Sequence, residues 1–168
     1  SNLLELSDWI SSKFLNLIEF TERSVLISLR LEFSKLFAKW FHMLVPQESL
    51  QVQLDESFSP IIIQGEIEMD YSFLSGGERT AAALAYRLAL NQTLNFLLSK
   101  IKTNDLVILD EPTDGFSEAQ IDKMRDVFEE LDVSQLIIVS HEQKIEGFVD
   151  HIIRVKKQGD LSIIESES

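Results

Sequence analysis

Apolar side chains recur at steps of three and four residues along the first 44 positions, a stretch without Gly or Pro. This spacing predicts one long helix, or two in series, over residues 3–44. The apolar positions are Leu6, Trp9, Ile10, Phe14, Leu17 and Ile18, and then Leu26, Leu29, Phe33, Leu36, Phe37, Trp40, Phe41 and Leu44. Such a seam is typical of the base of a coiled-coil arm, which needs a partner helix. Pro46 is expected to end the helix.

The period changes to two between residues 48 and 70. Apolar residues there alternate with polar neighbours at Leu50, Val52, Leu54, Ile67 and Met69. The alternation predicts antiparallel strands at the edge of a sheet, with Pro60 and Gly65 marking the turns.

From Phe73 onward the pattern predicts a helix, a strand, a helix, a strand, a short helix and two further strands. This order favours an α/β fold with a mainly parallel sheet and crossover helices. Together with the preceding segments, it divides the chain into an arm base, residues 1–45, and a lobe, residues 46–168.

A short glycine-containing loop begins the first helix of this lobe. Ser75, Gly76, Gly77 and Glu78 stand at the start of a helix predicted to continue to Lys100. Unpaired backbone N–H groups and the positive end of the helix dipole attract a phosphate at such a position, and glycines let the backbone approach it. The tetrapeptide alone is equally consistent with an ordinary turn and helix cap.

Two adjacent carboxylates follow the apolar run 106–109, which predicts a strand covered on both faces. Asp110 then lies at the carboxyl end of the strand, where open α/β sheets bind ligands, and it can hold the magnesium of a nucleotide. Glu111 can position or deprotonate an attacking water molecule. A helix cap or a solvated turn is the alternative, which Pro112 and Thr113 also fit.

A histidine follows the second apolar run, residues 136–139, in the same way. Because neighbouring parallel strands end at one rim, His141 is expected near Asp110 and Glu111, where it could hydrogen-bond a γ-phosphate. A lone histidine after a strand is more often structural, so the three segments must be considered together.

Composition narrows the class of protein. There is no cysteine, which excludes disulfides and thiolate metal sites. No secretory signal and no apolar run long enough for a membrane span is present, which favours a cytoplasmic protein without a membrane partner.

The net charge of −13 arises entirely beyond residue 45, so most of the lobe should repel DNA. Candidate basic clusters are Lys100 with Lys102, and Arg154 with Lys156 and Lys157, although solvated surface lysines are the more common explanation for both.

Two longer stretches extend the pattern. Residues 73–90 read FLSGGERTAAALAYRLAL, and residues 139–154 read VSHEQKIEGFVDHIIR. With the paired carboxylates between them, these stretches resemble the C-terminal ATPase half of the SMC-like DNA double-strand-break repair ATPases, the Rad50 family of the ABC ATPase superfamily, in its archaeal form. The resemblance covers about residues 50–168.

The resemblance implies an ABC-type ATPase lobe that uses ATP and Mg²⁺. The implied site residues are Asp110 for the metal, Glu111 and His141 for catalysis, and Ser75, Gly76, Gly77 and Glu78 for the nucleotide. Because this chain brings an anion-binding helix end but no Walker A cradle of its own, Ser75, Gly76 and Gly77 are expected to contact the γ-phosphate bound by the opposite subunit.

The resemblance also implies partners. No G-x-x-x-x-G-K-[ST] loop occurs in this chain, and in the family that Walker A loop lies at the other end of the polypeptide, beyond a coiled coil with a zinc hook. The expected partners are therefore the N-terminal Walker A half of the same protein, and a second copy in an ATP-dependent homodimer. The nuclease Mre11 is expected to bind through residues 1–44, and DNA through the assembled complex.

One position departs from the family pattern. Family members carry a Leu-Asp pair in the loop that crosses the ATPase dimer, and the corresponding residues here are Phe116 and Ser117. Asp114 could supply a carboxylate nearby.

Three other functions fit parts of the sequence. The chain could be half of a chromosome-structure SMC head, a transporter-type ABC subunit, or an interaction module without catalysis. The long helix ahead of the sheet argues against a transporter subunit, and the intact Asp110, Glu111 and His141 argue against a non-catalytic module.

Overall fold

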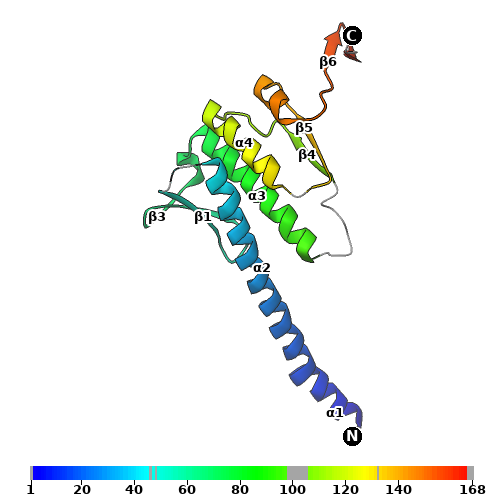
Figure 1. The fold of residues 1–168 in the computed structure, drawn as a ribbon. Coiled ribbons are helices and arrows are strands. Elements are labelled where there is room, and N and C mark those ends of the chain that lie inside the picture. Colours follow the sequence, from blue (N-terminus) through cyan, green and yellow to red (C-terminus); the bar gives the residue numbers. More distant parts are fainter. Residues whose placement is uncertain (1, 46, 48, 98–105, 132, 166–168) are drawn as a thin grey trace.

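The computed structural model describes residues 2–45, 47, 49–97, 106–131 and 133–165 of the 168-residue chain. A long helical rod projects from a lobe of helices and short sheets (Figure 1). Within the described residues no helix is both long and apolar enough to cross a membrane.

The rod consists of α1 (Asn2–Trp9), a π-helical turn η1 (Ile10–Phe14) and α2 (Leu15–Leu44). The helix predicted over residues 3–44 is therefore confirmed. It ends at Leu44, because Val45 adopts an extended backbone, while Pro46 lies outside the described residues.

The two ends of the rod have different surroundings. Its first half is exposed throughout, including large apolar side chains such as Leu17 at 61% and Phe20 at 70%. Its last three turns bury one stripe of residues at helical spacing: Phe33, Phe37, Trp40, Phe41 and Leu44.

This buried stripe packs against α3 (Gly76–Leu97). Four of the buried residues of α3 are small, namely Ala81, Ala82, Ala85 and Ala89, and Leu84 and Leu88 are buried with them. Small side chains on one helix let large aromatic rings on the other fill the interface without voids. Tyr86 adds ring contacts to Phe33 and Phe37, with centroids 4.9 and 5.6 Å away. Across the interface, Trp40 Nε1 donates a hydrogen bond of 3.0 Å to Gln92 Oε1.

Three antiparallel strands cover another side of α2: β1 (Leu50–Leu54), β2 (Pro60–Gln64) and β3 (Ile67–Met69). The predicted alternation holds in β1, whose Leu50, Val52 and Leu54 are buried while the residues between them are exposed. In the described part of the chain these strands form a sheet of their own and share no ladder with the parallel strands.

The parallel pair consists of β4 (Leu106–Asp110) and β5 (Gln135–Val139), joined by the crossover helix α4 (Glu118–Glu130). Beyond it lie the 3₁₀ segment η3 (Gln143–Phe148) and a hairpin of β6 (Val155–Gln158) and β7 (Leu161–Ile164). A further 3₁₀ turn, η2 (Tyr71–Phe73), precedes α3. The predicted order of elements after Phe73 is confirmed. The helix predicted to start at Glu78 begins two residues earlier, and its expected end at Lys100 lies outside the described residues.

The expectation that β4 and β5 are covered on both faces is wrong for this chain. Leu109 is buried in the core that the helices share, and Val107 and Leu136 pack against it. Residues of the opposite face remain exposed, with Ile108 at 61% and Val139 at 52%. In the described part of the chain the helices cover one face only, which leaves an apolar surface without a covering layer.

We expect the stability of the lobe to depend on the buried end of α2 and not on its exposed half. Phe37→Ala should lower the free energy of unfolding by about 3–5 kcal/mol, because it leaves a cavity between α2 and α3. Leu17→Ala, a truncation in the same helix, should change it by less than about 0.5 kcal/mol. Urea denaturation followed by circular dichroism gives both values, and similar losses for the two variants would contradict this account of the core.

Candidate functional site

The loop before α3 is a capped helix start. The Ser75 backbone N–H donates to Glu78 Oε2 at 2.7 Å, and the Glu78 N–H donates to Ser75 Oγ at 3.3 Å. This reciprocal pair satisfies two of the backbone donors at the helix start. The amides of Gly76 and Gly77 have no carbonyl one turn earlier to bond, because they lie in the first turn. The helix cap weighed as the alternative is thus present, and it leaves the first-turn amides of Gly76 and Gly77 without an intrahelical partner.

The two glycines of this loop have different surroundings. A Cβ atom added to Gly76 would meet open space. One added to Gly77, which is buried, would lie 2.9 Å from the carbonyl oxygen of Gly115 and 2.5 Å from Gln120 Oε1. Gly77 therefore meets a close neighbour within its own chain, whereas the sequence analysis attributed both glycines to the approach of an anion.

Asp110 and Glu111 occupy the carboxyl end of β4, as predicted. The Glu111 N–H donates to the Val139 carbonyl at 2.8 Å, which continues the parallel ladder by one residue. Glu111 itself has a φ of +44°, in the left-handed region that non-glycine residues rarely adopt. Such a conformation costs about 1–2 kcal/mol and persists where the surrounding structure holds it, commonly at functional sites.

His141 lies beside Glu111, since both follow neighbouring parallel strands. Its Nδ1 atom is 2.9 Å from Glu111 Oε2. The hydrogen bond to Glu111, together with the negative charge of that carboxylate, raises the pKa of His141, and Glu142 and Asp114 add smaller effects in the same direction. Both side chains are accessible, at 72% for His141 and 40% for Glu111. The pair can therefore meet a ligand from outside the chain.

A magnesium ion at Asp110 would need other ligands besides this chain. Among the described residues no group of three His, Cys, Asp or Glu side chains could hold a metal ion. Mg²⁺ is commonly bound by one or two carboxylates, with waters and substrate phosphates completing its shell. A single exposed Asp110 fits that mode and does not fit a metal cage built by the protein alone.

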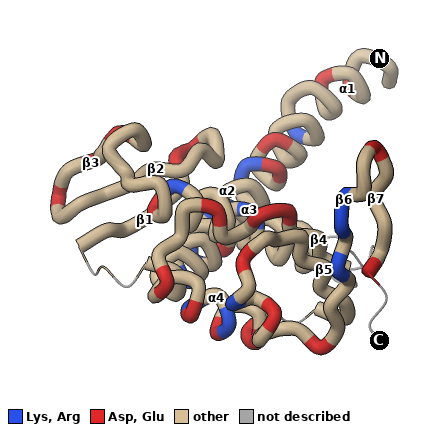
Figure 2. The backbone as a smooth tube through the Cα atoms, turned by 90° about the horizontal axis from the view of Figure 1, so that it is seen from above, with Lys and Arg blue, Asp and Glu red and all other residues tan. Residues whose placement is uncertain are grey.

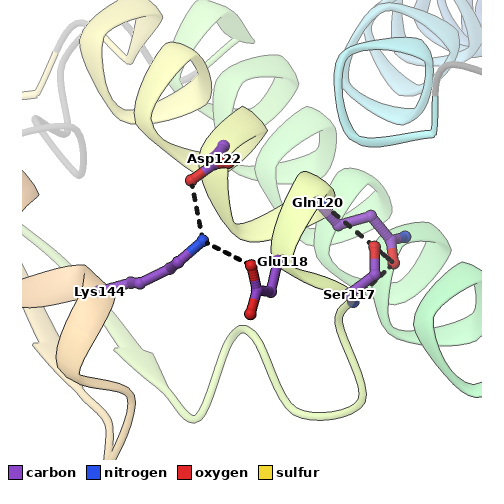
Figure 3. Close-up of polar contacts among 5 residues, drawn as sticks. All are labelled: Ser117, Glu118, Gln120, Asp122 and Lys144. Atoms are coloured by element: carbon purple, nitrogen blue, oxygen red, sulfur yellow. Dashed lines mark hydrogen bonds and ion pairs between the residues drawn. The ribbon is translucent and has the colours of Figure 1, made fainter.

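The loop between Glu111 and α4 accounts for the departure from the family pattern. Ser117 is the N-cap of α4 and forms a capping box with Gln120. Phe116 packs against the hydrophobic core, and Asp114 is exposed and close enough to affect His141. Lys144, from η3, reaches the same helix start through Glu118 at 3.4 Å and Asp122 at 3.5 Å (Figure 3).

The structure thus forms two clusters from the predicted site residues. Glu111 and His141 are in contact, and Asp110 directly precedes Glu111 in the chain. The Ser75–Glu78 loop instead lies against Gly115 and Gln120. Sequence reasoning missed Gly115, Gln120 and Lys144, although the Ser-x-x-Gln spacing of Ser117 and Gln120 is a recognisable capping signal.

Two of the three basic residues in the second cluster proposed for DNA contact are paired with carboxylates. Arg154 pairs with Glu146 and Lys156 with Glu165, and acidic residues are spread over the rest of the lobe (Figure 2). Lys100 and Lys102 lie outside the described residues. The described part of the second cluster therefore favours the interpretation as solvated surface residues.

No protein-family model matches the chain. Its fold is similar to SMC head domains that carry a coiled coil. The match to the Smc head with coiled coil and joint from Pyrococcus yayanosii has a TM-score of 0.77 at 22% identity. It covers 99% of this chain and 32% of the Smc chain. The match to the Smc head from Pyrococcus furiosus, bound to the C-terminal domain of ScpA, has a TM-score of 0.75 at 23% identity. It covers 99% of this chain and 42% of the Smc chain. The chain therefore has the fold of part of an SMC-type head with the base of its arm.

Relatives in sequence are more specific. The DNA double-strand break repair Rad50 ATPase of Pyrococcus abyssi is 39% identical over 107 residues, or 62% of this chain, and that of Thermoplasma acidophilum is 33% identical over 120 residues, or 68%. The Sulfolobus acidocaldarius Rad50 ATPase is 42% identical over 99 residues, or 56% of the chain. The chain is thus similar to archaeal Rad50 ATPases and fits the C-terminal half of such a protein. It spans only about a tenth of the length of these relatives, since 11%, 13% and 10% of each is matched.

The contact between His141 and Glu111 leads to a testable titration. We expect the pKa of His141 to lie above its ordinary value of about 6.5, and to fall toward that value in Glu111→Gln. Glu142→Gln should lower it less, because Glu142 acts only as a more distant charge. Since the folded-state pKa is raised, the stabilisation from this pair is complete below the unfolded pKa and is lost as pH rises through the folded pKa. NMR titration of the imidazole gives the pKa of His141 in the unaltered protein and in both variants. An equal decrease of this pKa in Glu111→Gln and Glu142→Gln would contradict the assignment.

Proposed function

We propose that this chain supplies three parts of a composite ATPase site, namely the signature motif, the Walker B carboxylates and the histidine loop, to a Rad50-type DNA repair clamp. A separate lobe with a Walker A loop completes the site. The observation that carries the proposal is the 2.9 Å contact between Glu111 and His141 at the ends of adjacent parallel strands, in a sequence that has no Walker A loop. Its similarity to Rad50 ATPases supports the same assignment.

The proposed roles follow from chemistry and position. Glu111 is the general base or the residue that orients the attacking water, and His141 holds its carboxylate in place. The other ring nitrogen of His141 remains available to a γ-phosphate. Asp110 holds Mg²⁺ together with the nucleotide, and the ion supplies charge neutralisation on the phosphates. These residues need a bound nucleotide from the Walker A lobe before any of them can act.

The signature loop acts in trans in this proposal. The first-turn amides of Gly76 and Gly77, with Ser75 and Glu78, face a γ-phosphate held by the opposite subunit. This chain contributes an anion-binding helix end without a phosphate cradle of its own, so a dimer of the joined halves is the assembly in which the two meet. ATP-dependent dimerisation would then control access of DNA and of a nuclease.

Two uncovered apolar surfaces support an N-terminal half as the missing partner. One is the outer face of β4 and β5, formed by Leu106, Ile108, Ile137 and Val139, all exposed. The other is the exposed half of the rod. A groove of about 390 Å³ beside it is lined by Phe20, Val25 and Leu29 of α2 and by Thr93 and Phe96 of α3. Contiguous exposed apolar surface on this scale marks a contact with another protein segment. A returning coiled-coil helix suits the rod, and the body of the Walker A lobe suits the sheet.

A chromosome-structure SMC head is the second candidate, and the likeness of the fold to Smc heads favours it. The identities of 30–42% to Rad50 ATPases, against 22–23% to these Smc heads, favour the repair clamp.

The main test removes the proposed catalytic carboxylate. In the complete ATPase, with this chain joined to its Walker A lobe, Glu111→Gln should still bind ATP but hydrolyse it at least about a hundredfold more slowly, because acid–base assistance is lost. The ATP-bound dimer should then persist for longer. Glu118→Gln is the matched control, since its exposed carboxylate lies outside the contact with His141, and it should hydrolyse ATP at the rate of the unaltered protein. Near-normal turnover by Glu111→Gln, measured by phosphate release, would remove Glu111 from this role.

The rod is also proposed as the docking site of the nuclease Mre11. One returning helix covers a single seam, whereas Phe20, Leu17 and Leu31 are all at least 61% exposed and leave further apolar surface for another partner. Removal of residues 1–32 keeps the buried stripe that starts at Phe33, so the lobe should remain folded and pair with its mate. In a pull-down, this shortened protein should lose Mre11 while the intact protein retains it. Equal capture by both would exclude the rod as the docking site.

A further inference from the structure

The first turn of α4 lies directly against the first turn of α3. Gln120 from α4 places its side-chain amide on the backbone of Gly77, where an added Cβ would lie 2.5 Å from Oε1 and 3.2 Å from Nε2. The carbonyl of Gly115 occupies the other side of the same space, at 2.9 Å. Gly115 in turn is close to Gly76, whose carbonyl carbon would be 3.5 Å from a Cβ at that position. Two segments 38 or more residues apart in sequence are therefore in close backbone contact here.

The Gln120 amide is held in this position by its own loop. Both the N–H and the hydroxyl of Ser117 donate to Gln120 Oε1 at 3.1 Å, and the Gln120 N–H donates to Ser117 Oγ at 3.4 Å (Figure 3). A side chain fixed by two hydrogen bonds loses much of its rotamer freedom, so it presents a defined surface to its neighbour. Gln120 is only partly exposed, as expected for a side chain enclosed between two helix starts.

The same loop leads back to the proposed catalytic carboxylate. The Asp114 N–H donates to the Glu111 carbonyl at 3.3 Å, and the Phe116 N–H donates to the Thr113 carbonyl at 2.9 Å. These successive turns connect Glu111 to Ser117 in six residues, and the buried Thr113 and Pro112 anchor the turns in the lobe. A continuous series of contacts thus runs from Glu111 through Ser117 and Gln120 to the signature loop.

We propose that Gln120 is a positioning residue for the signature loop. Its amide, locked by Ser117, is the surface on which Gly77 rests, so that the phosphate-binding end of α3 is held at a fixed distance from the loop that follows Glu111. In this view Gly77 is a glycine because the Gly115 carbonyl and the Gln120 amide together occupy the place of its side chain. The inference rests on the proposed role of the signature loop in ATP binding across the dimer.

Lys144 provides a contrast on the same turn of α4. Its ammonium reaches Glu118 and Asp122 at 3.4 and 3.5 Å from the outside of the helix, and all three side chains are largely exposed. Both of these ion-pair partners are carboxylates of α4, and neither Gly77 nor Ser117 is among the described partners of the Lys144 ammonium. Lys144→Ala therefore removes polar contacts from this turn without altering the surface beneath the signature loop.

The test compares three variants of the complete ATPase: Gln120→Ala, Gln120→Met and Lys144→Ala. Alanine and methionine both remove the two hydrogen bonds from Ser117 to Gln120 Oε1 and keep the one from the Gln120 backbone N–H. Both are good helix formers, but only methionine still fills the space against Gly77. Light scattering with increasing ATP gives the concentration for half-maximal dimerisation, and thermal unfolding gives the stability of each protein.

If Gln120 positions the signature loop, Gln120→Ala should need about tenfold more ATP for half-maximal dimerisation, which corresponds to about 1.4 kcal/mol. Gln120→Met and Lys144→Ala should stay within about twofold of the ATP concentration that the unaltered protein needs. Both Gln120 variants should show equal thermal stability, since both lose the same cap. Equal ATP requirements for Gln120→Ala and Gln120→Met would show that the cap alone matters and would overturn the inference. An unaltered protein that fails to dimerise with ATP would overturn the proposed function and this inference with it.

A second measurement tests the contact itself. Gly77→Ala should impair dimerisation strongly in the unaltered background, because its Cβ meets the Gln120 amide. In the Gln120→Ala background the same substitution should cost at least about threefold less, because the two contacts with the Gln120 amide are gone while the contact with the Gly115 carbonyl at 2.9 Å is kept. Additive effects of the two substitutions would show that Gln120 and Gly77 act independently, and would overturn the proposal.

Discussion

The packing of the aromatic end of α2 on the alanine face of α3 is the interaction on which the rest of the lobe depends. Phe33, Phe37, Trp40 and Phe41 are almost fully buried, and four of the buried residues of α3 are alanines. Large rings against small side chains allow a close helix pair with native packing density. The direction of α3 follows from this contact, and so does the position of its first turn, which carries the signature loop. The buried end of the arm and the signature loop are therefore linked through one helix–helix contact.

The same architecture leaves the chain incomplete. Helices cover only one face of β4 and β5, and the outer residues, such as Ile108 and Val139, are apolar and exposed. The first half of the rod has the same character. A single long helix cannot bury an apolar seam against itself, and a two-stranded parallel ladder cannot cover its own second face. The uncovered surfaces lie on the two structures that a Walker A half would extend, namely the sheet and the arm.

At the site, neighbouring elements restrain groups that would otherwise move. Glu111 keeps a left-handed backbone because its N–H continues the ladder to Val139 and its side chain meets His141. Gly77 is enclosed by Gly115 and Gln120. In the proposed ATPase site, such restraint would place charge and hydrogen-bond donors before a nucleotide binds and so lower the reorganisation that catalysis requires.

Much of the fold followed from the sequence, since hydrophobic period and chain order are properties of neighbouring residues. The helix over residues 3–44, the antiparallel strands after residue 48 and the helix–strand order beyond Phe73 were all predictable on that basis, as was the placing of Glu111 and His141 at one rim. Other features required the tertiary structure. The run 106–109 is apolar throughout, and only the arrangement of the helices decided which of its residues would be buried. Gly77 was readable as a glycine suited to an anion, but its contact with Gln120 depends on how α3 and α4 approach each other. That approach results from packing between residues far apart in the chain, which a local pattern does not encode.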